Sequence, residues 1–341
     1  QKICYNSAHM IILGIESSCD DTSVALLDCS SEGHVVITEK TASQIDIHKK
    51  YGGVVPELAG RAHAEKIIPL IESVLENNKK PDVIAVTSGP GLITGLLVGV
   101  EAAKTLSYIQ NIPLVSINHI EGHIHSVEIS DNKIAYPALA LIASGGHTEL
   151  TNIPKQGKYE RIGATRDDAA GECFDKVAKL LELSYPGGPQ ISKLAEDGNP
   201  KAIDLPRPMI GSKDYNFSFS GLKTAALYWL QKNPKFNKND FCASFEQAIV
   251  DVLVKKTIKA AKEYQPKTII LGGGVSANKK LKKTLEEKIK EEFSDSSFLT
   301  PQPVYSMDNA AMIAMAGYYK AKNKDFTDWK NIKADPNWKI C

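Results

Sequence analysis

The chain has 341 residues, of which 43% are apolar and 24% are charged, and its formal net charge is +1. This length and composition suit a soluble globular protein of about two domains. They exclude a membrane-spanning protein, because no apolar run reaches about 18 residues, and a disulfide scaffold, because the six cysteines are scattered without a CxxC pair. No global basic field is present, so any nucleic acid must be bound by a local patch or through a partner.

The first ten residues lack the apolar core of a secretory signal, and the fold prediction leaves them out. The cysteine usage favours a reducing compartment. We therefore expect a cytoplasmic protein without membrane contact, with the mitochondrial matrix as the alternative.

The first half of the chain alternates between strand and helix patterns. The predicted strands are 11–15, 24–27, 83–87 and 114–117, and the predicted helices are 57–75 and 96–109. This alternation predicts an α/β domain with helices flanking a sheet.

The second half continues in the same style. The predicted strands are 138–143, 149–150 and 268–271, and the predicted helices are 167–183, 241–264, 278–290 and 310–319, with a hard stop at 186–189. The strand–turn–strand pattern around the turn 16–23 recurs around the turn 144–148, which indicates a duplicated domain. We expect two α/β lobes around a nucleotide cleft, 11–134 and 135–330, with the final helix able to return to the first lobe.

A histidine pair follows the strand predicted at 114–117. If a helix begins here, His119 and His123 are at positions i and i+4, so both imidazoles can reach one metal ion. The alternative is a pair of capping or core histidines. A zinc protease is disfavoured. In the protease motif the glutamate that acts as general base directly follows the first histidine, but this chain has Ile120 there. Its acid, Glu121, is one position further on, which rotates the side chain by about 100° around a helix.

Three turns have residues suited to phosphate. The turn 16–23 is rich in hydroxyls and acids, 144–148 contains Gly145 and Gly146, and 272–278 begins with three glycines and lies between a strand and a helix. Backbone N–H groups in such turns bind anions, although each turn alone could be a plain hairpin or connection. Together, the first two would hold phosphate from opposite lobes.

Asp308 stands just before the helix predicted at 310–319. A carboxylate at this place is usually an N-cap. As a third ligand beside the two histidines it would complete a two-histidine, one-carboxylate set, which suits catalysis by Fe(II) or zinc.

Taken together, the motifs resemble those of the TsaD-type tRNA threonylcarbamoyladenosine synthases, in a form similar to the bacterial and mitochondrial branches. The resemblance rests, in order, on GIESSCDDTSVAL, VPELAGRAH, TSGPGLITGLLVG, NHIEGH, SGGHTEL, DDAAGECFDKVAKLL, YPGGP, FSFSGLKTA, GGGVSAN and MDNAAMIA. They run from about Leu13 to Gly317, nearly the whole chain. The resemblance implies the actin-like ATPase (ASKHA) fold.

The resemblance also implies roles for individual residues. The implied metal ligands are His119, His123 and Asp308. The implied substrate-binding residues are Ile142, Ala143, Ser144, Gly145, Gly146, Asp175, Gly188 and Asn278. Asp20 matches an acidic turn position of suspected catalytic function. The implied cofactors are one divalent metal, Fe(II) first and then zinc or magnesium, and a nucleotide (ATP, AMP or threonylcarbamoyl-AMP).

The implied reaction transfers a threonylcarbamoyl group from threonylcarbamoyl-AMP to the exocyclic amine of the adenosine 3′ of the anticodon in ANN-decoding tRNA. The implied partners are tRNA, a threonylcarbamoyl-AMP synthase as supplier, and a paralogous actin-like subunit with a small ATPase subunit, or a second copy of this chain. A face of the helix 57–75 is a candidate docking surface. Three alternatives stay open: an actin-like ATPase or small-molecule kinase, a metalloprotease, and a non-enzymatic scaffold for tRNA modification.

Overall fold

The computed structural model describes residues 9–30, 33–130 and 132–341, so residues 1–8 of the N-terminal segment set aside above lie outside it. The chain divides into two compact units, here called unit 1 (1–47, 54–133 and 301–340) and unit 2 (48–53, 134–300 and 341). The long segment of unit 2 ends at Thr300, whereas the predicted second lobe runs to 330, with a final helix able to return to the first lobe. None of the helices in the described residues is long and apolar enough to cross a membrane.

Unit 1 is built on a five-stranded sheet of order β3-β2-β1-β4-β5. Its strands are β1 (His9–Glu16), β2 (Asp21–Ser30), β3 (His34–Ser43), β4 (Val83–Gly89) and β5 (Leu114–Asn118). Its helices are α2 (Pro56–Leu75), α3 (Ile93–Gln110), α4 (His119–His125) and α10 (Ala310–Lys322), with 3-10 turns η1 (Ser126–Ser130) and η3 (Pro303–Tyr305), and with α1 (Ile45–His48) at the boundary to unit 2. The first three strands are antiparallel, and β4 and β5 continue the sheet parallel to β1.

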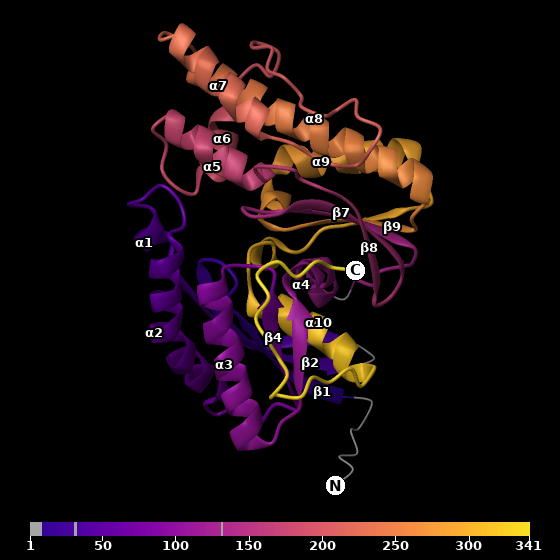
Figure 1. Ribbon diagram of the computed structural model, residues 1–341. Helices are drawn as coiled ribbons and strands as arrows, with labels where there is room; N and C mark the ends of the chain where they lie inside the picture. The colour runs from indigo at the N-terminus through magenta and orange to yellow at the C-terminus, as the bar shows by residue number, and fades with distance from the viewer. Residues whose placement is uncertain (1–8, 31–32, 131) are drawn as a thin grey trace. The chain divides into compact units, whose positions relative to one another are not determined.

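The two faces of β1 belong to two apolar cores. Met10 and Ile12 pack with α10, whereas Ile11 and Leu13 pack with α2 and α3. Figure 1 shows α2 and α3 side by side in this unit, and α10 in yellow against the strands. A strand buried on both faces has no polar alternation, which explains the uninterrupted apolar run in the sequence.

The backbone of α10 lies directly on β1 at Gly14. A Cβ at this position would come within 2.1 Å of the carbonyl oxygen of Ala310, the first residue of α10. Only a glycine allows this approach. This contact holds the start of α10, and the nearby Asp308, against the end of the strand β1.

Unit 2 repeats the sheet of unit 1. Its order is β10-β9-β6-β7-β8, with three antiparallel strands and two parallel ones in the same sequence of connections. Its strands are β6 (Ala138–Ala143), β7 (Thr148–Lys155), β8 (Lys158–Ala164), β9 (Thr268–Gly272) and β10 (Ser297–Leu299). Its helices are α5 (Ala170–Leu180), α6 (Gly187–Ala195), α7 (Ser220–Lys232), α8 (Lys238–Tyr264) and α9 (Lys279–Glu292), with a 3-10 turn η2 (Gly274–Ala277). The predicted duplication is thus confirmed by the shared strand order.

Two local predictions in unit 2 were wrong. The residues 186–189 are not a helix stop; they form the start of α6. Pro189 is tolerated there because N–H groups in the first turn of a helix have no partner within the helix, so the N–H that proline lacks is not missed. The helix predicted from 167 starts at Ala170. Asp167 instead accepts hydrogen bonds from the backbone N–H groups of Phe219 (2.8 Å) and Ser220 (3.2 Å) and thereby caps the start of α7.

Glu149 on β7 offers a test of the core of unit 2. Its side chain is buried, with Thr151 Oγ1 at 3.5 Å and an Arg161 guanidinium nitrogen at 3.8 Å, and burial raises its pKa to about 7. This folded-state pKa exceeds the unfolded value of about 4.5, so the folded protein loses stability as the pH rises from 4.5 through 7. We expect Glu149→Gln to gain roughly 2–3 kcal/mol of unfolding free energy relative to the native chain between pH 5 and pH 8. Urea unfolding at both pH values measures this; an equal difference at the two pH values would contradict it.

Candidate metal centre and nucleotide site

The helix α4 brings two imidazoles to one place in unit 1. Asn118 caps α4, because its side chain accepts a hydrogen bond from the Ile120 N–H (2.9 Å), and the helix begins at His119. His119 and His123 then lie one turn apart, as the spacing predicted. Both side chains are buried, His123 completely.

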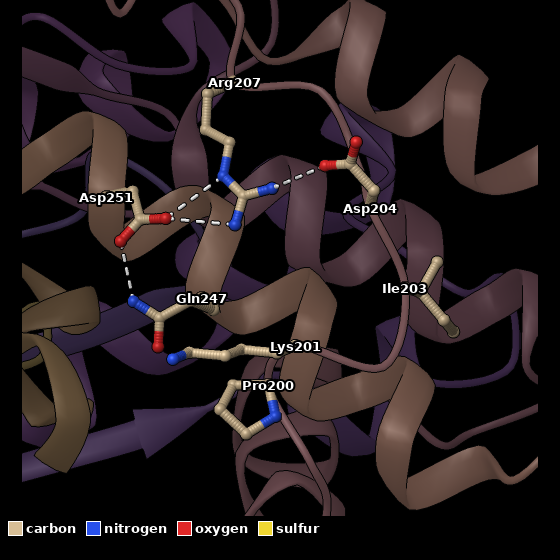
Figure 2. Close-up of a pocket in the computed structure, with 7 residues that line it drawn as sticks. All are labelled: Pro200, Lys201, Ile203, Asp204, Arg207, Gln247 and Asp251. Atoms are coloured by element: carbon tan, nitrogen blue, oxygen red, sulfur yellow. Dashed lines mark hydrogen bonds and ion pairs between the residues drawn. The ribbon is translucent and has the colours of Figure 1, made fainter.

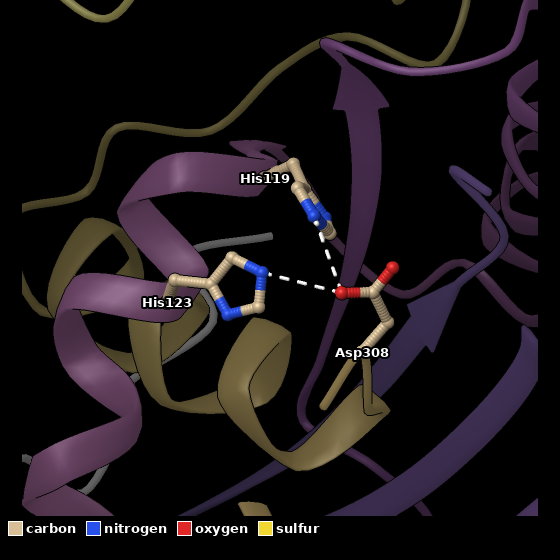
Figure 3. A group of neighbouring side chains, drawn as sticks. All are labelled: His119, His123 and Asp308. Atoms are coloured by element: carbon tan, nitrogen blue, oxygen red, sulfur yellow. Dashed lines mark ion pairs between the residues drawn. The ribbon is translucent and has the colours of Figure 1, made fainter. Parts of the chain in front are cut away.

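Asp308 approaches the two imidazoles from a distant part of the chain. Its Oδ1 lies 3.5 Å from Nε2 of His119 and 3.2 Å from Nε2 of His123. Figure 3 shows the carboxylate directed at both rings. Asp308 is not the cap of α10, since the adjacent Asn309 accepts the hydrogen bond from the Met312 N–H. The carboxylate is therefore directed at the histidines.

The spacing and the hydrogen bonding of this cluster fit a bound metal ion. Four ligands around a tetrahedral ion at about 2.1 Å lie about 3.4 Å apart, close to the two distances from Asp308. Within the described residues, neither ring nitrogen of His123 forms a hydrogen bond, although both are buried. Nε2 reaches Asp308 Oδ1 at 3.2 Å without hydrogen-bond geometry, and a metal ion bound to both atoms would satisfy this buried nitrogen.

The electrostatics of the cluster favour a cation. Burial alone would lower the pKa of His119, but the carboxylates of Asp308 and Glu16 raise it to about 10. Burial opposes ionisation of Asp308, yet the two histidines hold its pKa well below the usual range. Burial also lowers the pKa of His123. The site thus holds an ionised carboxylate beside two imidazoles, one charged and one neutral, and a divalent ion can replace the proton of the charged one.

Sequence reasoning missed Glu16, the last residue of β1. Its carboxylate is fully buried and lies 3.1 Å from Nδ1 of His119. The only sequence signal was its place in the turn 16–23, since its partners Thr87 and His119 lie far along the chain. Asp20, in the same turn, is partly exposed and is not a member of the cluster; its carboxylate and that of Asp308 both act on the Cys19 thiol, whose pKa burial already raises.

The predicted phosphate turn of unit 2 is the β6–β7 hairpin. The Ser144 N–H donates to the His147 carbonyl (2.7 Å), and the His147 N–H donates to Ser144 Oγ (3.1 Å). Gly145 and Gly146 at its tip are exposed, and a Cβ on either would meet nothing within 4 Å. The tip therefore offers bare backbone to open space.

The glycine run after β9 lies against the end of β6. Gly273 has a φ of +82°, and a Cβ there would come within 2.4 Å of the Ala143 carbonyl oxygen. Ile142, next to it, pairs with Gly272 across the parallel strands. The two predicted loops therefore meet at the carboxyl ends of adjacent parallel strands, where α/β folds bind ligands.

The remaining predicted residues are joined through α6. Asp175 on α5 accepts a hydrogen bond from the Gly187 N–H (2.7 Å), one residue before Gly188. Asn278 caps α9 and donates to Ser192 Oγ on α6 (2.9 Å). Asn278 also donates to Glu246 Oε1 on α8 (2.7 Å), a contact for which the sequence had no signal because Glu246 lies within a long helix. Asp175 and Gly188 thus lie at the start of α6, and Asn278 contacts the same helix at Ser192.

A sequence model for tRNA N6-adenosine threonylcarbamoyltransferase, TsaD, matches residues 35–315. The chain belongs to the TsaD family. It is 49% identical to the tRNA N6-adenosine threonylcarbamoyltransferase of Thermosipho melanesiensis, over 96% of this chain and 99% of that protein. It is 48% identical to the enzyme of the same name from Bacillus subtilis, over 90% of both chains.

Solved structures with little sequence identity share the fold of this TsaD-family chain. HypF from T. kodakarensis matches with a TM-score of 0.63 at 13% identity, over 93% of this chain and 48% of that one. Component A of (R)-2-hydroxyglutaryl-CoA dehydratase from Acidaminococcus fermentans matches with a TM-score of 0.54 at 16% identity, over 92% of this chain and 99% of that one. The predicted actin-like ATPase fold is confirmed.

Two other features of this TsaD-family chain take no part in the predicted sites. Glu121, the acid that a protease would need, forms an ion pair with Lys320 on α10 (3.4 Å) and is not a member of the metal cluster. A pocket of about 520 Å³ in unit 2, shown in Figure 2, is lined in part by Arg207, whose guanidinium forms an ion pair with Asp251 (3.0 Å). None of the predicted site residues lines this pocket.

Proposed function

We propose that this TsaD-family chain transfers a threonylcarbamoyl group from threonylcarbamoyl-AMP to the exocyclic amine of the adenosine 3′ of the anticodon in ANN-decoding tRNA. The family membership supports the transferase class. The observation that carries the metal-dependent form of the proposal is the cluster of His119, His123 and Asp308, a ligand set that a plain ATPase or kinase of this fold does not need.

The cluster would hold one divalent ion through Nε2 of each histidine and Oδ1 of Asp308. Two imidazoles and one carboxylate suit Fe(II) or zinc, whereas magnesium prefers oxygen ligands. When bound, the ion supplies Lewis-acid stabilisation of charge on an acyl or phosphate oxygen.

The residues of unit 2 would bind the adenylate part of the donor. The N–H groups of Gly145 and Gly146 suit the leaving phosphate, because backbone donors in such a turn stabilise an oxyanion. Asp175 accepts the Gly187 N–H, and a carboxylate oxygen can also accept a hydrogen bond from a ribose hydroxyl. Gly188 and Asn278 would border the nucleoside.

The acceleration would come mostly from positioning. An exocyclic adenosine amine is a weak nucleophile, and holding it against the activated carbonyl can supply about 7–11 kcal/mol. Asp20 would orient this amine or accept its proton, since its side chain is partly exposed in the turn after β1. The proton and AMP leave as the new carbon–nitrogen bond forms.

The proposal includes partner proteins. A threonylcarbamoyl-AMP synthase would supply the donor, and a paralogous actin-like subunit with a small ATPase subunit, or a second copy of this chain, would bind α2 and α3. These two helices expose Ile68, Ile93 and Leu97, with 51%, 41% and 46% of each residue accessible. Exposed apolar side chains on two helices that pack together support a docking surface.

The test is mass spectrometry of nucleosides from ANN-decoding tRNA. The tRNA is incubated with this chain, the adenylate-forming enzyme, threonine, bicarbonate and ATP, with and without the partner subunits. We expect threonylcarbamoyladenosine with the native chain and with His9→Ala, an exposed histidine of unit 1, and none with His119→Ala/His123→Ala. Product that survives the double substitution would remove the metal site from the proposal. No product in any combination, with ATP turnover intact, would favour a plain ATPase.

A further inference from the structure

Glu16 has contacts that hold its carboxylate in one orientation. Oε1 accepts a hydrogen bond from the Ser18 N–H (2.5 Å), and Oε2 accepts one from Thr87 Oγ1 on β4 (2.7 Å). The side chain is fully buried, where an ionised carboxylate is costly without such partners. The turn after β1 and the neighbouring strand therefore fix both oxygens.

The third contact of Glu16 decides which nitrogen of His119 carries a proton. Oε2 lies 3.1 Å from Nδ1 of His119. An ionised carboxylate only accepts hydrogen bonds, so Nδ1 must donate. With the proton on Nδ1, the neutral ring presents the lone pair of Nε2, the nitrogen that faces Asp308.

The two imidazoles of the cluster are not equivalent. His119 has a carboxylate behind it, whereas Nδ1 of His123 has no hydrogen-bond partner in the described residues. Ser18 Oγ also lies 3.1 Å from Nδ1 of His119, so a hydroxyl shares this position with the carboxylate. Glu16 therefore makes its direct contact with the cluster through His119, while its charge also acts on His123.

We propose that Glu16 is a positioning residue of the metal centre, which fixes the Nδ1–H tautomer of His119 and supplies a second negative charge to the buried site. Two neutral imidazoles and ionised Asp308 leave a divalent ion with one uncompensated positive charge, and Glu16 cancels it. Histidine ligands in proteins commonly donate to such an outer carboxylate, and losing it costs about 10–100-fold in metal affinity. This inference rests on the metal assignment proposed above.

The competing explanation is that Glu16 only ties β1 to its turn and to β4. Thr87→Val removes the tie to β4 but leaves the contact with His119, and Ser18→Ala removes only the hydroxyl. Glu149→Gln changes a buried carboxylate of unit 2 that is not a member of the cluster. These three variants are the controls for Glu16→Gln.

The experiment titrates each chelator-treated full-length protein with Co(II) and follows its visible d–d absorption, and then repeats the titration with zinc in competition with a chromophoric chelator. We expect Glu16→Gln to weaken Co(II) and zinc binding about 10–100-fold and to shift the d–d bands. Glu149→Gln should stay within about threefold of the native chain, and Thr87→Val and Ser18→Ala, which keep the Glu16 carboxylate beside His119, should lose clearly less affinity than Glu16→Gln. Glu16→Asp, which keeps the charge on a shorter side chain, should recover part of the affinity, and it replaces Glu16→Gln if that variant does not fold.

The outcomes separate this inference from the metal assignment. A native chain that binds neither metal overturns both. A native chain that binds metal, with Glu16→Gln equal to it, overturns only the role of Glu16. Equal losses of metal affinity in Thr87→Val and Glu16→Gln would show that Glu16 only links β1 to β4.

Discussion

A chain carrying Asp308→Asn is expected to lose both its bound metal and its transfer activity. Oδ1 of Asp308 is the oxygen that approaches both imidazoles, and a neutral amide is a weak ligand for a divalent ion. Because losing even an outer partner costs about 10–100-fold, losing this ligand should lower metal affinity and transfer rate by at least about 100-fold. Metal content after gel filtration, measured by mass spectrometry, and the rate of threonylcarbamoyladenosine formation give the two readouts.

Asn309→Ala is the matched control, one residue away. It removes the side chain that caps α10 and should lower stability by about 1 kcal/mol, while leaving the three ligands in place. The two neighbouring substitutions should therefore have different effects: Asp308→Asn should lose the metal, and Asn309→Ala should lose only part of the stability of α10. An Asp308→Asn chain that retains stoichiometric metal with native affinity would place the ligand set elsewhere.

The sequence predicted the parts of the cluster that depend on local structure. His119 and His123 could be placed on one helix face because a strand pattern precedes them and helical spacing separates them. Asp308 could not be joined to them by spacing, since the contact forms only when α10 packs on β1 at Gly14. The resemblance to a family supplied that link, and the same packing explains why Pro301–Ile340 belongs to unit 1.

The elements that the sequence missed have weak or conflicting patterns. In β3 most side chains are partly or fully exposed, so it lacks the apolar run that marks β1. The start of α6 contains two glycines and a proline, which usually end helices, and α7 is capped by Asp167 from another loop. In each case a tertiary contact overrides the local preference.

The polar contacts behind the site were the hardest to foresee. Glu16 looks like a turn residue, and Glu246 looks like a helix residue, until their partners His119 and Asn278 are seen beside them. A buried carboxylate gains its role from groups that lie far away in the sequence. Contacts between a site residue and such a buried carboxylate are therefore visible only in the folded chain.

Gly145→Val and Gly146→Val should fold normally and bind the adenylate poorly. A Cβ at either position meets no protein atom within 4 Å, and neither glycine has a positive φ, so a side chain costs the empty protein little. If the donor phosphate lies against this backbone, the added methyl groups occupy its place. We expect the dissociation constant of AMP or of a non-hydrolysable threonylcarbamoyl-AMP analogue, measured by calorimetry, to rise at least about tenfold, which corresponds to about 1.4 kcal/mol.

Gly211→Val is the control for this pair. Gly211 is also an exposed glycine of unit 2 with no atom within 4 Å of its Cβ position, but it lies in the loop before α7. All three variants should unfold at nearly the native temperature, and only those in the β6–β7 hairpin should lose affinity. If Gly145→Val and Gly146→Val bind the nucleotide with native affinity, the hairpin is not part of the nucleotide site. The proposal for the metal centre would still stand, because the hairpin and the metal centre belong to separate units of the chain. Lost affinity in all three would indicate a general loosening of unit 2.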